Sequence, residues 1–374
     1  MKVVAYIFFV TIFSFNIFNI TYANENSKIY GLIKKNNLTI ISYSKNWNNS
    51  SLEALYRELL NNTISNEIQY LSKIIINASG NSNVFAEYND DISVNKDGTY
   101  HLGHNATITI NYGNRYKNIK DIAYFLSHEY GHHYTLYNIV KYEQIYPSEL
   151  LLNTEYGNLR NLRNYPISYN ISRNYNYIWD IQEILANDYV QLLGSKTAKQ
   201  SYKYKDNLQK VQEGLESQEY EPLFYNALPQ QNKYLPIATS VNGLLKYFLK
   251  IANYNYFADN SIIKLPKIVN IKEIKQSYGK QYILLYDRDI NNKNLEYTVI
   301  MHPKDSNFTI FPLKTLNYNE EPIVIFGNTQ YKDKNGKLYT YSESYEGKYE
   351  FIIYSKDSSG LIFASEPFIY DFGK

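Results

Sequence analysis

Two stretches of the chain place apolar residues three or four positions apart, the spacing that turns one face of a helix toward a core. In the first, Asn118 can cap the start with Asp121 near the third helical position, and no proline intervenes before residue 140. Its apolar stripe consists of Ile119, Ile122, Phe125, Leu126, Leu136 and Ile139. The second begins near Tyr177 and stops at Gly194. The pattern therefore predicts two strong helices.

Shorter apolar runs and turn signals predict the elements around these two helices. Ser50 and Glu53 can form a capping box that opens an earlier helix. Residues 65–76 fit either a helix or a strand, because the apolar run is too short to decide. The acidic segment 90–97 lacks the glycine of a calcium loop, so we expect a polar turn that ends in the hairpin dipeptide Asp97-Gly98. The remaining expectations are strands at 37–43 and 99–112, an irregular segment at 141–176, and helices at 204–217 and 236–252.

After Asp259 the pattern changes to short alternating runs separated by turns such as Asn335-Gly336. The runs lie at 282–286, 297–301, 322–326, 337–341, 349–354 and 361–364. They predict an all-β sandwich of about 110 residues, and its late strands resemble those of immunoglobulin-like or fibronectin type III-like modules. The expected organisation is a first domain at 24–258, which mixes helices with a sheet, followed by the sandwich at 259–374.

The start of the chain has the pattern of an export signal. Lys2 is the only charge in the first 24 residues, and residues 3–13 are almost entirely apolar. We therefore expect a signal peptide at 1–23, cleaved after Ala23, and a secreted protein. An uncleaved membrane anchor is the alternative, which Asn16 and Asn19 weaken. No later stretch of the sequence is apolar over a length that could cross a bilayer.

Composition excludes two kinds of site. The chain has no cysteine, so it can form neither a disulfide framework nor a thiolate metal site. Without Lys2 the 38 basic residues fall to 37, against 36 acidic residues, and neither sign is concentrated along the chain. Such a balanced charge does not favour a nucleic-acid partner. Any bound metal must be held by histidines and carboxylates.

The first strong helix carries the sequence His-Glu-Tyr-Gly-His at 128–132. His128 and His132 are one turn apart, so both imidazoles leave the same face of the helix and can reach one metal ion. Glu129 lies at the rim of that face, where a carboxylate can take a proton from a metal-activated water. Random sequence of this length would give about 0.005 such motifs. The pattern predicts a zinc site rather than two packed core histidines, and His133 should point away from it.

Zinc needs a third protein ligand from a later part of the chain. The candidates are Glu143, Asp180, Glu183 and Asp188. Glu143 stands at the end of the same helix and points away. Glu183 is the best choice, because it lies within the largely apolar second helix, where an unpaired carboxylate would be costly. Ala186 would let this helix approach the first one closely.

These residues resemble the gluzincin zinc metallopeptidases, in which the third ligand is a Glu on a following helix that carries a short Glu-x-x-Ala signature, here at 183–186. Asn187 lies on the same face as Glu183 and can hydrogen-bond a ligand imidazole, with Asp188 as the second choice for that role. The tyrosine-rich approach to Glu183 further resembles the lethal-factor-like branch of secreted bacterial gluzincins. That resemblance implies a tyrosine that stabilises the oxyanion, either Tyr175 or Tyr177.

The resemblance implies a zincin-like α+β domain with a mixed sheet, an active-site helix, a glutamate helix and a helical second half. It also implies that the strand before the active-site helix forms the sheet edge, where an extended peptide can pair. The sequence thus predicts a secreted zinc endopeptidase in which His128, His132 and Glu183 hold one zinc ion and Glu129 is the general base.

Two kinds of partner follow from this prediction. They are an extracellular peptide or protein substrate, and a surface or matrix ligand for the C-terminal sandwich. The alternative function is that of an extracellular surface or matrix-binding protein, in which the sandwich carries the activity and the zinc site is structural or decayed.

Overall fold

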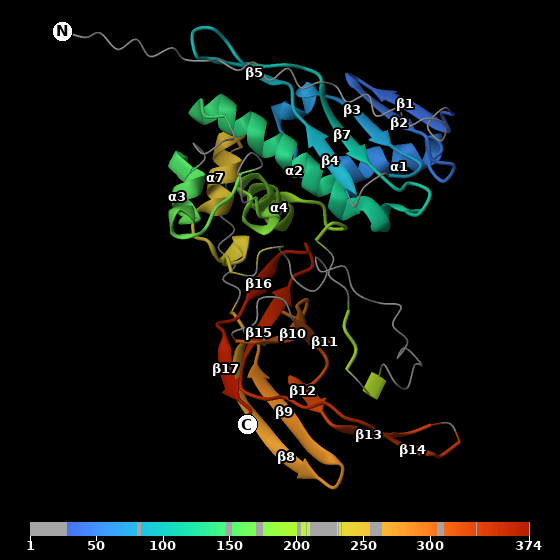
Figure 1. The fold of residues 1–374 in the computed structure, drawn as a ribbon, viewed down its shortest axis with the longest axis vertical. Coiled ribbons are helices and arrows are strands. Elements are labelled where there is room, and N and C mark those ends of the chain that lie inside the picture. The colour runs from blue at the N-terminus through green and yellow to red at the C-terminus, as the bar shows by residue number, and fades with distance from the viewer. Residues whose placement is uncertain are drawn as a thin grey trace, which may run out of the picture.

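The computed structural model describes residues 28–80, 84–146, 152–169, 175–199, 203–206, 208–209, 230, 232, 234–254, 264–304, 310–333 and 335–373. The predicted signal peptide, most of the helix predicted at 204–217 and the expected domain boundary near residue 259 lie outside these ranges. Figure 1 shows an N-terminal region that combines a sheet with helices, and a C-terminal region of strands. None of the described helices has the length and apolar character needed to cross a bilayer.

Five strands form the N-terminal sheet, in the order β1-β2-β3-β7-β4. They are β1 (Gly31–Lys35), β2 (Leu38–Ser42), β3 (Leu71–Ile76), β7 (Ala106–Ile110) and β4 (Ala86–Asn89). The three central strands are parallel, whereas β1 and β4 pair antiparallel with their neighbours. The sheet is therefore mixed, as the sequence predicts. A hairpin of β5 (Ile92–Val94) and β6 (Tyr100–Leu102) connects β4 to β7.

The edges of this sheet are formed by β1 and β4, and not by the strand that precedes the helix with the His-Glu-Tyr-Gly-His sequence. The predicted strand at 99–112 contains β6 and β7, and β7 lies inside the sheet between β3 and β4. The expectation that this strand forms the edge is wrong. The earlier segment β4 is only four residues long and pairs with the outer side of β7, so its sequence gives too little alternation to predict it.

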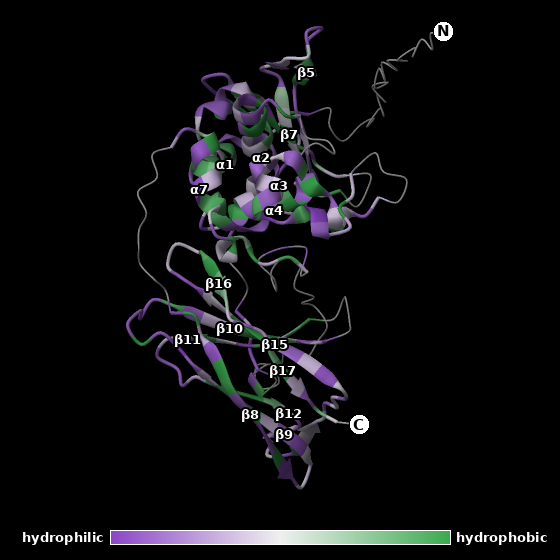
Figure 2. Cartoon of the chain, turned by 90° about the vertical axis from the view of Figure 1, so that its left-hand side faces the viewer, coloured by the Kyte–Doolittle hydropathy of each residue, from purple (hydrophilic) through white to green (hydrophobic). Residues whose placement is uncertain are grey.

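Helices cover the sheet and complete the N-terminal core. They are α1 (Asn49–Leu60), α2 (Ile119–Glu143), α3 (Glu155–Leu159), α4 (Ile181–Leu193) and α7 (Leu244–Ile251), with short 3-10 helices η1 (Asn66–Tyr70), η3 (Leu162–Asn164), η4 (Tyr177–Trp179) and η5 (Ala238–Ser240). In Figure 1, α2 runs between the sheet and the helices α4 and α7. Figure 2 shows apolar and polar residues together along α7, whose buried side chains include Phe248. One apolar core joins all these elements.

Several predicted boundaries move in the structure for local reasons. Asn48, and not Ser50, caps α1, because the Asn48 side chain accepts a hydrogen bond from the Ser51 amide at 3.1 Å. Residues 65–76 contain both candidate structures, the 3-10 helix η1 followed by β3. The helix expected at 236–252 is divided, because Gly243 takes a positive φ of 84° between η5 and α7.

The C-terminal region is all-β, as predicted. Its strands are β8 (Lys267–Gln276), β9 (Gly279–Asp287), β10 (Glu296–Pro303), β11 (Phe311–Asn317), β12 (Ile323–Gly327), β13 (Thr329–Lys332), β14 (Leu338–Tyr341), β15 (Lys348–Lys356), β16 (Ile362–Ala364) and β17 (Phe368–Asp371). One sheet has the order β11-β10-β15-β16, with β17 paired to β15, and another has the order β12-β9-β8. Both contribute to a second apolar core, for example through Leu284 and Val299. The likeness to immunoglobulin or fibronectin modules stays a prediction.

Candidate metal centre

The helix α2 places the His-Glu-Tyr-Gly-His sequence in the interior of the N-terminal region. The predicted capping box is present: Asn118 accepts from the Asp121 amide, and the Asp121 side chain accepts from the Asn118 amide. The sequence 128–132 lies in the middle of this 25-residue helix, and His128, Glu129 and His132 are each no more than 7% exposed. The two histidines and Glu129 therefore lie on a buried part of a long helix.

The helix α4 supplies the third member of the centre. This helix begins at Ile181, four residues later than predicted. Asp180 caps it, because it has extended backbone angles and its side chain accepts a hydrogen bond from the Gln182 amide at 2.8 Å. Residues 177–179 form the separate 3-10 helix η4. Glu183 consequently lies in the first turn of α4, where the positive end of the helix dipole favours a carboxylate.

Helices α2 and α4 cross in close contact beside this centre. A Cβ atom on Gly131 would lie 3.0 Å from the carbonyl oxygen of Ala186 and 3.0 Å from the ring of Tyr189. Glycine on α2 and alanine on α4 thus bring the two backbones together, as the small side chain of Ala186 led us to expect. The crossing sets the distance between the two histidines on α2 and Glu183 on α4.

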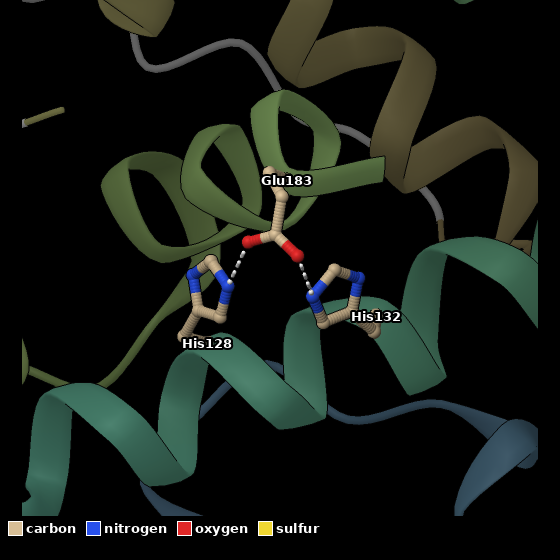
Figure 3. A group of neighbouring side chains, drawn as sticks. All are labelled: His128, His132 and Glu183. Carbon is tan, nitrogen blue, oxygen red and sulfur yellow. Dashed lines mark hydrogen bonds and ion pairs between the residues drawn. The ribbon is translucent and has the colours of Figure 1, made fainter. Parts of the chain in front are cut away.

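Figure 3 shows both histidines pointing at the carboxylate of Glu183. His128 Nε2 lies 3.0 Å from Glu183 Oε2, and His132 Nε2 lies 3.6 Å from Glu183 Oε1. Two ligands of a tetrahedral zinc ion, each about 2.05 Å from the metal, are separated by about 3.3 Å. The observed distances bracket this value. The three side chains can hold a metal ion, and they form the one such group among the described residues.

The electrostatics of Glu183 suit a ligand carboxylate. Burial opposes its ionisation, but the charge of His132 and the hydrogen bonds from both histidines outweigh that effect. The pKa of Glu183 is therefore held well below its usual value, and the side chain stays ionised. A negatively charged oxygen facing two imidazole nitrogens is a donor set that suits zinc.

Glu129 has the opposite electrostatic environment. Burial raises its pKa to about 8, His128 opposes this shift, and the neighbouring carboxylates of Glu183 and Glu87 add to it. A bound dication would stabilise the carboxylate and lower this pKa. Glu87 belongs to the edge strand β4, so a charge on this strand acts on the Glu129 carboxyl.

Asn187 forms its described side-chain hydrogen bonds with groups other than the two imidazoles. Its Oδ1 accepts a hydrogen bond from the hydroxyl of Tyr124 at 2.7 Å, and its Nδ2 donates to the carbonyl oxygen of Glu183 at 2.8 Å. The expected direct bond to His128 or His132 is absent from the hydrogen bonds of the described residues. Asn187 instead connects the ligand helix α4 to Tyr124 on α2.

Asp188 lies in a different, fully buried network. Its carboxylate pairs with the Arg160 guanidinium at 2.9 and 3.0 Å and accepts a hydrogen bond from Tyr156 at 2.9 Å. Burial raises the pKa of Asp188 to about 6, although Arg160 and the hydrogen bonds oppose the shift. Arg160 also donates to the carbonyl of Pro236 at 2.6 Å. These contacts join α4 to α3 and give Asp188 a place in the core packing.

The two tyrosines proposed as oxyanion stabilisers occupy distinct positions before α4. Both are partly exposed, Tyr175 at 44% and Tyr177 at 42%. Tyr175 hydrogen-bonds the side chain of Asp180, and burial together with the charges of Asp180 and Glu183 raises its pKa, so its hydroxyl stays protonated. The charge of Glu183 therefore acts on Tyr175.

His133 and Tyr130 on α2 form a hydrogen-bond network on the side of the helix away from the metal group. His133 Nε2 lies 2.9 Å from the carbonyl oxygen of Glu67, which can only accept, so this nitrogen carries the proton. His133 Nδ1 then accepts from the hydroxyl of Tyr88 on β4 at 3.0 Å. The Glu67 carboxylate accepts a hydrogen bond from Tyr130. His133 thus points away from the metal group, as predicted, and the network ties α2 to η1 and to the sheet edge.

Comparisons with known proteins add little to this geometry. No family model matches the chain, and no curated protein matches it. Among solved structures, the M60 catalytic domain of ZmpC from Clostridium perfringens, determined in complex with the sialyl T antigen, aligns with 91% of this chain and 69% of that chain, at 11% identity and a TM-score of 0.17. That TM-score does not define a shared fold.

Proposed function

We propose that this protein is a zinc-dependent endopeptidase. The observation that carries the proposal is the meeting of two histidine Nε2 atoms from one helical turn with the Glu183 carboxylate of a second helix, at 3.0 and 3.6 Å. Glu129 lies between the two histidines in sequence and is buried beside them. This is the residue set that peptide hydrolysis by a metal-activated water requires.

Zinc is the metal that the donor set favours. Two neutral imidazoles and one carboxylate form a common catalytic zinc site, and the chain has no cysteine to offer. When bound, zinc would act as a Lewis acid toward water and the scissile carbonyl. A group with three protein ligands matches catalytic sites, because structural zinc sites are usually closed by a fourth ligand. This supports the enzyme over a binding protein with a structural site.

Glu129 would serve as general base and then as general acid. Burial raises the pKa of Glu129 to about 8, and a bound dication would lower it, so that the carboxylate could accept a proton from the attacking water and deliver it to the leaving amine. Tyr175 would donate a hydrogen bond to the oxygen that becomes negative during attack. Its hydrogen bond with Asp180 and the nearby charge of Glu183 support this role, and Tyr177 is the other candidate.

The third ligand and its helix support the gluzincin class, in which a Glu on a following helix completes the site. An extended peptide would then bind along β4, which is one of the two edge strands of the described sheet and the one whose Tyr88 stacks on His132. Secretion after cleavage at Ala23, a division into domains at 24–258 and 259–374, and a surface or matrix ligand for the C-terminal region belong to the same proposal.

The experiment that tests this function is cleavage of a peptide library by the purified protein. Wild-type protein should cleave, a chelator should abolish cleavage, and added zinc should restore it. Glu129→Gln should retain one zinc ion and lose at least about a thousandfold in rate, the scale of a lost general base. Zinc-loaded Glu129→Gln with wild-type activity would exclude Glu129 as the base, and a zinc-loaded wild type that cleaves no peptide would favour the binding-protein alternative.

A further inference from the structure

Each histidine of the metal group has a tyrosine ring stacked against it. Tyr124 stacks on His128 with ring centroids 5.9 Å apart and planes inclined by 27°. Tyr88 stacks on His132 with centroids 6.1 Å apart and planes inclined by 8°. Tyr124 precedes His128 by one turn of α2, whereas Tyr88 comes from the edge strand β4. The two rings therefore reach the group from different elements.

The hydroxyl groups of the two tyrosines have different partners. That of Tyr88 donates to His133, outside the metal group. That of Tyr124 donates to Asn187 Oδ1 at 2.7 Å, and Asn187 Nδ2 donates to the carbonyl oxygen of Glu183 at 2.8 Å. One amide thus connects the ring that covers one ligand with the backbone of another ligand. We call these two hydrogen bonds the Tyr124-Asn187 bridge.

His128 lacks the contact that usually orients a ligand histidine. The second ring nitrogen of such a histidine commonly donates to a carboxylate or a carbonyl, which fixes the plane of the ring. His128 Nδ1 is buried, and the part of the chain that the structure describes offers it no hydrogen-bond partner. Asn187, which the sequence suggests for this role, directs its amide to Tyr124 and Glu183 instead. Two rings pack against His128 instead, that of His132 edge-on at 4.9 Å and that of Tyr124 stacked at 5.9 Å, and of these the ring of Tyr124 is the one nearly parallel to the imidazole.

We propose that Tyr124 is a positioning residue of the metal centre with two separable parts. Its ring fixes the plane of the His128 imidazole. Its hydroxyl, through Asn187, holds the first turn of α4 in place and so fixes the position of the Glu183 carboxylate. The inference rests on the metal centre within the proposed function and does not depend on peptide hydrolysis.

Three substitutions in the full-length chain separate the two parts. Tyr124→Phe keeps the ring and breaks the bridge, Asn187→Ala breaks the bridge from its other end, and Tyr124→Leu removes both ring and bridge. Zinc affinity, measured by competition with a chromophoric chelator, should fall about tenfold for each bridge variant. The double variant should be no more than about twofold weaker than either single one, because both remove the same connection. Tyr124→Leu should lose about a hundredfold.

A matched control distinguishes positioning from ordinary packing. Tyr134→Phe also removes a buried tyrosine hydrogen bond from α2, the one to the carbonyl of Phe248 at 3.1 Å, and it should leave zinc affinity within about twofold of wild type. Cobalt substitution adds a readout of ligand geometry, since its visible absorption depends on the arrangement of the ligands. Tyr124→Leu should shift that spectrum, and Tyr134→Phe should not.

Several outcomes would overturn the inference. They are zinc affinities of Tyr124→Phe and Asn187→Ala within twofold of wild type, additive losses in the double variant, or a wild-type cobalt spectrum for Tyr124→Leu. If Tyr124→Leu does not fold, the inference is tested by the zinc affinities of Tyr124→Phe, Asn187→Ala and their double variant alone. A wild-type protein without zinc affinity would remove both the metal centre and this inference, whereas one that binds zinc and cleaves no peptide would remove only the proposed activity.

Discussion

At the scale of single residues, Glu183 is the side chain that turns two histidines into a three-membered group. The sequence predicted it because a carboxylate on an apolar helix needs a charged partner, and the structure places it 3.0 and 3.6 Å from the imidazole nitrogens. His128 and His132 were predictable because their spacing is local to one helix. The partners of Asn187 and the stacking of Tyr88 and Tyr124 were not, because they depend on contacts between separate elements.

Glu183→Gln should weaken zinc binding by at least about a hundredfold, because the amide keeps the shape of the side chain but loses its charge. Elemental analysis after dialysis should find one zinc per chain in the wild type and much less in the variant. Glu143→Gln is the matched control. Glu143 lies at the far end of α2, where its carboxylate accepts a hydrogen bond from the hydroxyl of Tyr247 on α7. Unchanged zinc content in Glu183→Gln would move the third ligand elsewhere.

His133 should make the metal-free protein less stable as the pH falls. Burial lowers the pKa of His133 from 6.5 to about 4. Between these two pH values, His133 is protonated in the unfolded chain and neutral in the folded chain. The contribution of neutral His133 to the free energy of unfolding is fully present above pH 6.5. It decreases toward pH 4 by about 3 kcal/mol in total. Urea unfolding at several pH values, in the presence of chelator, should show a smaller pH slope for His133→Gln. Equal slopes in both proteins would contradict this assignment.

At the scale of elements, the crossing of α2 and α4 determines the geometry of the centre. The start of α2 could be predicted from Asn118 and Asp121, because a capping box is a local signal. The exact start of α4 could not, because it depends on the extended angles of Asp180 and on its β-bridge with Ser168, a pairing between separate segments of an irregular region. The edge strand β4 was missed for a related reason, since only its pairing with β7 makes its four residues a strand.

Gly131→Ala should disturb the crossing. The new Cβ would lie 3.0 Å from the Ala186 carbonyl, and such overpacking costs about 1–3 kcal/mol, against a gain of about 1 kcal/mol from the better helix propensity of alanine. We expect a net loss of about 1 kcal/mol in the free energy of unfolding and weaker zinc binding, as α4 carries Glu183 away from the histidines. A variant that is more stable than wild type and binds zinc equally well would show that the crossing tolerates a side chain.

At the scale of the whole molecule, two apolar cores are joined by a small set of polar contacts. The segment 203–206 lies along β11, where the Thr315 amide donates to the Tyr204 carbonyl at 2.9 Å and Lys314 pairs with Asp206 at 3.2 Å. Thr239 donates to the carbonyl of Ile362. The change from helical spacing to alternation near residue 259 was visible in the sequence, whereas these joining contacts were not, because each pairs residues more than 100 positions apart.

Metal removal should therefore affect one core and not the other. Zinc binds only to folded protein in this scheme, so it stabilises the N-terminal core that contains α2 and α4. Calorimetry should show two transitions, and chelator should lower the midpoint of one by several degrees while leaving the other unchanged. Equal shifts of all transitions would show that the two cores unfold as one cooperative unit.

The most direct test of the metal centre is anomalous diffraction from zinc-soaked crystals at wavelengths on either side of the zinc absorption edge. A peak that appears only above the edge should lie about 2.0–2.2 Å from His128 Nε2, His132 Nε2 and a carboxylate oxygen of Glu183. A zinc peak bound elsewhere, with these three side chains still bonded to one another, would contradict the proposed centre and the activity built on it.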